Sequence, residues 1–251
     1  MLVTLGSGEE ISAGASQTFT YACNSVQGVM IRTEDSADSQ DGHVTVQVGN
    51  EVICNDIDFT ALAYLSRVKG GLGSDSASAA DMFIDFGSHV LDANESLYVT
   101  IRNSDTANVL GAVDVSALVD GQGIYAPIKV TNYADKVFTD SNTLEVYAWG
   151  TTSLDEDASA MTIRNSAGSS SPAILSGVSW SMKTNQLSSN YIAKMCENQV
   201  PLNTTVNYTS ALPSGVLCIS AMDRLPSKQA DATRTGRNLV RSLSSSEAKA
   251  L

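Results

Sequence analysis

The chain has 251 residues, of which 27 are acidic and 15 are basic, so its formal net charge at neutral pH is −12. Because non-specific binding to nucleic acid depends on Lys and Arg that neutralise phosphates, this balance argues against direct contact with DNA or RNA. Charged residues make up only 17% of the chain, and the abundance of small, polar and β-branched residues favours strands joined by polar turns over a helical bundle.

The first half of the sequence predicts strands interrupted by one helix. Alternation of apolar and polar residues predicts strands at 17–22, 28–34, 43–53, 81–87, 96–103 and 111–119. In the strand at 96–103, the alternation places Leu97, Val99 and Ile101 on one face. The sequence "DGQG" at 120–123 breaks this pattern, and it predicts the end of a first domain.

The helix is predicted in "NDIDFTALAYLSRVKGG", residues 55–71. Asp58 is a good N-cap, because its side chain can accept hydrogen bonds from the first turn, and Gly70 is a natural C-terminal stop. The apolar residues of one helix face are Phe59, Leu62, Ala63 and Leu65. We expect this face to cover an open end of a β-sandwich.

The second half repeats this order of elements. Strands are predicted at 126–138, 143–150, 159–165, 174–182, 204–212 and 215–223. A second helix is predicted at 183–198, where Thr184 can act as the cap and Leu187, Tyr191 and Met195 follow one another at intervals of four. Each half therefore runs strand, acidic loop, strand, helix, strand, turn, strand.

A sandwich with a helix in one long connection is compatible with a jelly roll. The predicted fold class is all-β, a double jelly roll of two tandem antiparallel sandwiches, each with one short helix in a connection. The first jelly roll spans residues 1–121 and the second spans 122–226. Residues 227–251 form a basic C-terminal tail.

A resemblance to a known family rests on three stretches of the first half. These are "HVTVQVGNEVICNDIDFTALAYLSRVKGG", "ADMFIDFG" and "SLYVTIRNSDTANVLGAVDVSALVDG". Together they resemble the first jelly roll of the major capsid proteins of tailless, membrane-containing icosahedral phages, of the corticovirus-like type. The likeness covers residues 10–120, and it extends over 121–225 only through the repeated pattern, because the second half is short for this family.

The resemblance implies a structural virion protein without enzymatic activity. It implies a homotrimeric capsomer of pseudo-six-fold shape that tiles an icosahedral shell, with the barrels upright on an inner lipid membrane. The partners would be further copies of the chain, other virion proteins and the membrane, with no direct contact to nucleic acid. The chain would lie in the virion after synthesis in the host cytoplasm, and its N-terminus lacks the basic start and apolar core of a secretory signal.

Two acidic loops are candidate calcium sites, since calcium binds clustered carboxylate oxygens. They contain Glu34, Asp35, Asp38 and Asp41 in the first half and Asp155, Glu156 and Asp157 in the second. Neither loop has the EF-hand spacing, and a solvated loop without a metal is the alternative. We expect no other cofactor.

The basic tail contains Lys228, Arg234, Arg237 and Arg241. It is interpreted either as a solvated tail or as a segment that contacts an acidic surface, which would be lipid headgroups or a neighbouring subunit.

Enzymatic motifs are absent from the sequence: it contains no GxSxG, HExxH or Walker loop. His43 and His89 are the only histidines, and we expect no catalytic role for them. The four cysteines have no CxxC spacing and are predicted to be buried free thiols. Trp149 and Trp180 are predicted to fill the core rather than to form a sugar-stacking platform.

Two other functions stay open from the sequence. One is a minor capsid or vertex protein with a single jelly roll and a smaller C-terminal module. The other is a glycan-binding or adhesive β-sandwich, for which an exposed aromatic platform would be the expected feature.

Overall fold

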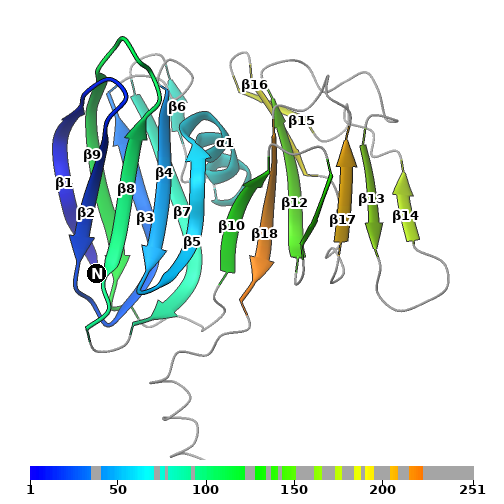
Figure 1. The fold of residues 1–251 in the computed structure, drawn as a ribbon, viewed down its shortest axis with the longest axis horizontal. Helices are drawn as coiled ribbons and strands as arrows, with labels where there is room; N and C mark the ends of the chain where they lie inside the picture. The colour runs from blue at the N-terminus through cyan, green and yellow to red at the C-terminus, as the bar shows by residue number, and fades with distance from the viewer. Residues whose placement is uncertain are drawn as a thin grey trace, which may run out of the picture.

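The computed structural model describes most of the first half of the chain and the strands of the second half. The described residues are 1–34, 41–70, 74–76, 79–91, 94–121, 128–133, 137–140, 143–150, 161–165, 173–176, 184–187, 190–194, 204–208 and 215–222. Figure 1 shows the first half as a two-layered sandwich at one end of the molecule and the second half beside it.

The first half forms a jelly roll of two facing sheets. One sheet has the order β1 (Leu2–Ile11), β9 (Leu110–Val119), β3 (Ser25–Thr33), β7 (Ala79–Val90) and the short β6 (Ser74–Ser76). The facing strands have the order β5 (Glu51–Asp58), β4 (Gly42–Val48), β8 (Leu97–Asn103) and β2 (Ser16–Tyr21). Apart from the short β6, these are eight strands in two antiparallel layers, the arrangement of a jelly roll.

The second half repeats this strand order. One layer is β10 (Ile128–Tyr133), β18 (Gly215–Ala221), β12 (Thr143–Gly150), β16 (Asn190–Lys194) and β15 (Thr184–Leu187). The other is β11 (Val137–Asp140), β17 (Thr204–Tyr208), β13 (Met161–Asn165) and β14 (Ala173–Ser176). The orders β1-β9-β3-β7 and β2-β8-β4-β5 thus recur as β10-β18-β12-β16 and β11-β17-β13-β14. The predicted double jelly roll is confirmed.

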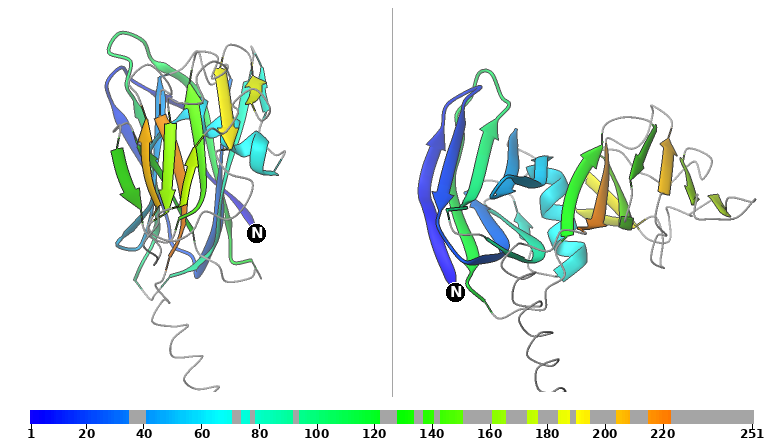
Figure 2. Two further views of the ribbon diagram at one scale, coloured as in Figure 1. Left: turned by 90° about the vertical axis from the view of Figure 1, so that its right-hand side faces the viewer. Right: turned by 60° about the horizontal axis from the view of Figure 1, so that its bottom comes forward.

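One parallel strand pair joins the two jelly rolls. Val130 of β10 is paired with Cys54 of β5, and Thr131 is paired with Asn55. This pairing makes one layer of each jelly roll part of a single nine-stranded sheet, which the two views in Figure 2 show from the side and from below. The predicted domain boundary at residues 121 and 122 lies beside residues 122–127, which are outside the described part, so its exact position stays a prediction.

The core of the first jelly roll follows the predicted alternation. Along β8, Leu97, Val99 and Ile101 are fully buried between residues that are only partly buried. The strand β4 alternates in the same way. Alternate residues of a strand point to opposite faces of its sheet, so this pattern fills the space between the two layers with branched apolar side chains.

The helix α1 (Phe59–Gly70) begins and ends as predicted, but its surroundings differ. The Asp58 Oδ1 atom accepts hydrogen bonds from the backbone N–H groups of Thr60 at 2.7 Å and Ala61 at 3.4 Å, which confirms the N-cap. All side chains from Phe59 to Ser66 are buried. The helix packs against β7, β5, β4 and β6 of the first jelly roll and against β16 of the second, as Figure 1 shows.

The prediction that α1 covers an open end of the first sandwich agrees with its contacts to β7 in one layer and to β4 and β5 in the other, but its burial is not confined to one apolar face. The part of the helix from Phe59 to Ser66 is buried on all sides because it lies between two jelly rolls, and a helical segment in that position needs apolar or small side chains around its whole circumference. Ser66 fits this position, since its hydroxyl accepts a hydrogen bond from the Phe83 N–H at 2.8 Å and donates one to the Phe83 carbonyl at 2.7 Å. The helix thus takes the place of a strand along the edge of β7.

Two predicted strands need correction, and one strand was not predicted. The predicted strand 43–53 is a hairpin of β4 and β5, with Gly49 at a φ of +58° in its turn. The predicted strand 126–138 contains two separate strands, β10 and β11, which belong to different sheets. The strand β1 was not predicted, because its apolar residues Leu2, Val3 and Leu5 do not alternate regularly with polar ones, and three register shifts lie between Thr4 and Ile11.

The second predicted helix, at 183–198, is also wrong. Its described residues form β15 and β16, which pair with each other, and β16 pairs with β12 through Trp149 and Ile192. The spacing of Leu187, Tyr191 and Met195 suits a helix, but Tyr and Ile also have high strand propensity. Because this segment can pair with the edge of β12, the strand conformation is favoured over the helix.

We expect Leu62→Ala to lower the free energy of unfolding by about 2–5 kcal/mol, because Leu62 is fully buried and the surrounding elements cannot close around the space left behind. Chemical denaturation measures the change. Thr20→Ala, at an exposed position of β2, is the matched control and should change stability by less than about 0.5 kcal/mol. Equal losses for the two variants would contradict the buried position of α1.

Candidate functional site

The predicted calcium ligands lie mostly outside the described residues. Glu34 and Asp41 are described, on either side of residues 35–40, whereas Asp35, Asp38 and the second loop (Asp155, Glu156, Asp157) are not. Among the residues that the structure describes, no three His, Cys, Asp or Glu side chains gather closely enough to hold a metal ion. Calcium binding therefore stays a prediction.

The predicted contact residues of the tail, Lys228, Arg234, Arg237 and Arg241, also lie outside the described part. A membrane or subunit contact through them stays a prediction. Within the described residues, no helix has the length and apolar character needed to cross a membrane.

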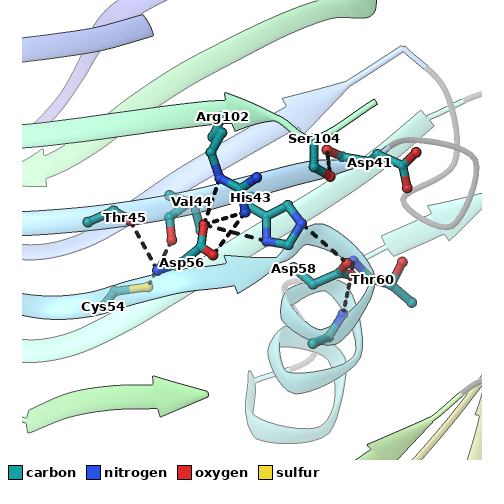
Figure 3. A network of polar contacts seen from close by, with 11 residues as sticks. Asp41, His43, Val44, Thr45, Cys54, Asp56, Asp58, Thr60, Arg102 and Ser104 are labelled. Atoms are coloured by element: carbon teal, nitrogen blue, oxygen red, sulfur yellow. Dashed lines mark hydrogen bonds and ion pairs between the residues drawn. The ribbon is translucent and has the colours of Figure 1, made fainter. Parts of the chain in front are cut away.

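A network of charged side chains lies on the outer face of the first jelly roll, next to the N-terminus of α1 (Figure 3). Arg102 of β8 donates to both carboxylate oxygens of Asp56 at 2.9 Å through Nη2, and its Nε donates to Oδ1 at 3.1 Å. The His43 Nδ1 atom is 3.6 Å from Asp56 Oδ1, and its Nε2 is 4.0 Å from Asp58 Oδ2. The network thus ties three neighbouring strands to the helix cap.

A β-bulge in β5 places Asp56 in this network. Cys54 pairs with Val46 and Ile57 pairs with Val44, so two residues of β5 lie opposite the single residue Thr45 of β4. Asp56 adopts a φ of +47°, and its N–H donates to the Thr45 hydroxyl at 3.0 Å. Bulges redirect side chains in this way, and here the bulge lies where β10 joins β5.

The chemistry of this network is structural rather than catalytic. In the described part of the chain, the two groups that His43 faces are carboxylates, and a nucleophile-activating base would instead need a hydroxyl or thiol beside it. The Arg102–Asp56 pair is partly exposed, so it fixes geometry more than it adds stability, contributing roughly 0.2–1 kcal/mol. Burial raises the pKa of the Asp58 carboxyl, while His43 and the amides of Thr60 and Ala61 oppose that rise.

His89 connects the two jelly rolls. It lies near the end of β7, where its Nε2 atom is 3.1 Å from the carbonyl oxygen of Ile128 in β10. Its ring meets Phe86 edge to face at 6.3 Å. Burial lowers the pKa of its imidazole, so the neutral form is favoured there, donating its Nε2 proton to Ile128.

The predictions for the cysteines and tryptophans are confirmed for Cys54, Cys218 and Trp149, which are buried, but not for Cys23, which is only half-buried. None of the three described cysteines forms a disulfide, and burial and the nearby Asp120 raise the pKa of Cys23 to about 11. Raised pKa values make thiols unreactive. Trp149 is buried, and its indole N–H donates to Asn132 at 3.4 Å. Cys196 and Trp180 lie outside the described residues.

The outward face of the β1-β9-β3-β7 sheet carries apolar side chains that are partly exposed. Leu2 is 58% exposed and is paired with Leu118 of β9. Met30 of β3 is paired with Phe83 of β7, and the Phe83 ring lies over Gly28, where a Cβ atom would come within 2.7 Å of it. This row of four apolar residues is a candidate contact surface, since the pleat points it away from the core.

A sequence pattern could have located part of these features. Alternation already placed Arg102 on the outer face of β8, opposite the buried Leu97, Val99 and Ile101. Asp56 and the bulge have no comparable signal, because their positions depend on the register between β4 and β5, which only pairing determines.

Comparisons with known proteins agree with the fold. Three solved viral structures match over most of the chain. The crystal structure of the major capsid protein of STIV has a TM-score of 0.57 at 9% identity and covers 88% of this chain and 95% of that one. The atomic structure of Sulfolobus Turreted Icosahedral Virus matches with a TM-score of 0.54 at 10% identity, covering 94% and 96%.

The major capsid protein P2 of bacteriophage PM2 has a TM-score of 0.51 at 8% identity and covers 89% of this chain and 98% of its own. No protein-family model and no curated protein sequence matches the chain. The chain therefore has the double jelly-roll fold found in these capsid proteins, and the comparisons establish the fold at the level of architecture.

We expect Asp58→Ala to lower the free energy of unfolding by about 1 kcal/mol, because the N–H groups of Thr60 and Ala61 lose their acceptor. Asp58→Asn is the control, since Asn caps a helix as well as Asp does and carries no charge. Chemical denaturation distinguishes the two. A loss for Asn as large as the loss for Ala would contradict the capping role.

A comparison of the wild type with Asp58→Asn tests the raised pKa of the Asp58 carboxyl. A carboxyl whose pKa is raised by folding stabilises the protein fully below its unfolded pKa of about 3.9, and that contribution is lost as the pH rises through the folded pKa. The stability of the wild type relative to Asp58→Asn should therefore fall as the pH rises above about 4. A pH-independent difference would contradict the raised pKa.

Proposed function

We propose that this chain is the major capsid protein of a tailless icosahedral virus, assembling as a homotrimer of pseudo-six-fold shape that tiles the shell. The observation that carries the proposal is the repetition of one jelly-roll strand order in the two halves. Two similar barrels side by side in one chain allow three chains to present six similar units around one axis. The likeness to the viral proteins of STIV and PM2 supports the same assembly.

The surface composition supports a shell protein that does not bind the genome. The net charge of −12 leaves few cations for phosphates. The partly exposed apolar row of Leu2, Leu118, Met30 and Phe83 is the kind of surface that is buried when copies associate. The partners in this proposal are further copies of the chain, other virion proteins and an inner lipid membrane, which the basic tail would contact.

The alternative functions have less support. A minor capsid protein with a single jelly roll is contradicted by the second jelly roll. A glycan-binding module would use exposed aromatic rings as a platform, whereas Trp149, the tryptophan that the structure describes, is buried.

Size-exclusion chromatography with light scattering tests the trimer. At high protein concentration we expect a mass of about 79 kDa, three times the chain mass of 26.4 kDa. Parallel runs with calcium and with EDTA show whether the acidic loops contribute. A strictly monomeric protein at high concentration, also in high calcium, would contradict the proposal.

Vesicle flotation tests the membrane contact of the tail. Replacing Lys228, Arg234, Arg237 and Arg241 together by Gln should abolish binding to vesicles with anionic lipids, because each basic residue near such a surface contributes about 1 kcal/mol. The wild type should bind at low salt and dissociate at high salt. Equal binding of both proteins would contradict a lipid contact through these residues and would favour a neighbouring subunit as the partner of the tail.

A further inference from the structure

We propose that copies of this chain associate edge to edge, with the strand β14 of one copy lying parallel to the strand β1 of the next. The inference rests on the proposed homotrimer and names the surfaces that form it. The partner is a second copy of this chain, and the bonds are main-chain hydrogen bonds that extend a sheet from one subunit into its neighbour.

The pairing inside the chain provides the template. In the order of the jelly roll, β5 is the fifth strand of the first half, and β10 is the first strand of the second. The parallel contact of Val130 and Thr131 with Cys54 and Asn55 joins these two strands. The corresponding strands at the outer ends of the molecule are β14, the fifth strand of the second half, and β1, the first strand of the first half.

Among the strands that the structure describes, both of these are at the ends of their sheets. The strand β1 ends the order β1-β9-β3-β7-β6, and β14 ends the order β11-β17-β13-β14. Joining the five strands of the first sheet to the four strands of the second through β1 and β14 gives a sheet of nine strands. That sheet would repeat, strand for strand, the nine-stranded sheet that β5 and β10 form inside the chain.

The two edges lie at opposite ends of the molecule, as Figure 1 shows. A contact between different surfaces of identical subunits is heterologous, and it either closes into a ring or continues as a filament. Repeating the internal contact between copies would apply the same turn at every joint, and the proposed trimer requires that this turn closes the ring. A ring of three copies would then contain alternating internal and copy-to-copy joints of the same kind.

The start of β1 is suited to this pairing. Met1 and Val119 exchange two backbone hydrogen bonds, since the Met1 nitrogen donates to the Val119 oxygen and the Val119 N–H donates to the Met1 oxygen. With Val3 paired to Ala117 in regular register, the antiparallel pattern turns the N–H and C=O groups of Leu2 and Thr4 away from β9, toward the open edge.

The remainder of β1, unlike its start, is unsuited to pairing with another strand. Three register shifts lie between Thr4 and Ile11, and Gly8 has a φ of +67°. Such irregularities protect edges from association. The regular segment at the start of the strand lacks this protection and carries the exposed apolar side chains Met1 and Leu2, at 62% and 58% exposure. The regular, apolar start of β1 is therefore the part of this edge that a second copy can pair with.

The decisive variant is Thr4→Pro, which removes an outward N–H group and leaves the bonds of Val3 to β9 in place. We expect it to raise the concentration needed for half-maximal trimer formation at least about tenfold, since every joint of the ring loses a hydrogen bond. Thr4→Val keeps the N–H and is the matched control. Light scattering measures assembly, and circular dichroism of dilute protein confirms that both variants fold.

Hydrogen exchange of the wild type gives a second test that needs no variant. Peptides covering residues 2–5 and 173–176 should exchange more slowly in concentrated, trimeric protein than in dilute protein. A trimer that leaves both peptides unprotected and tolerates Thr4→Pro would overturn the edge pairing and leave the proposed capsid function standing. A protein that remains monomeric at every concentration would overturn both.

Discussion

The parallel pairing of β5 with β10 is the contact on which the rest of the molecule depends. It fixes the second jelly roll beside the first, and it creates the space in which residues 59–66 of α1 are buried. His89 adds a hydrogen bond across the same boundary, to Ile128 at 3.1 Å. The helix therefore serves as packing between two jelly rolls, which explains why a chain made almost entirely of strands includes it.

The same contact determines which edge strands lie at the two ends of the molecule. The internal joint pairs the β5 edge of the first jelly roll with the β10 edge of the second, and the corresponding strands β14 and β1 are among those that end the sheets of the described part of the chain. The bulge at Asn55 and Asp56 lies at this joint, and the Arg102–Asp56 pair holds it in shape. The polar network on this face is best understood as support for the joint.

The sequence predicts those elements that depend on residues close together in the chain, and it does not predict those that depend on pairing between distant strands. The alternation around Val99 and the cap at Asp58 were predictable, because each depends on residues close together in the chain. The helix predicted at 183–198 is a pair of strands, since a sheet edge was available to Tyr191 and Ile192. Neither β1, with its irregular register, nor the bulge at Asp56 has a periodicity that could be read in advance.

A map of the purified oligomer by electron cryo-microscopy tests the central claim most directly. Two alike jelly rolls joined side by side in every chain predict six barrel-shaped densities around one axis for three chains, with sheet density running across every boundary between neighbours. A map with one barrel for each chain, or with the two halves of a chain separated by solvent where β5 and β10 meet, would contradict the account.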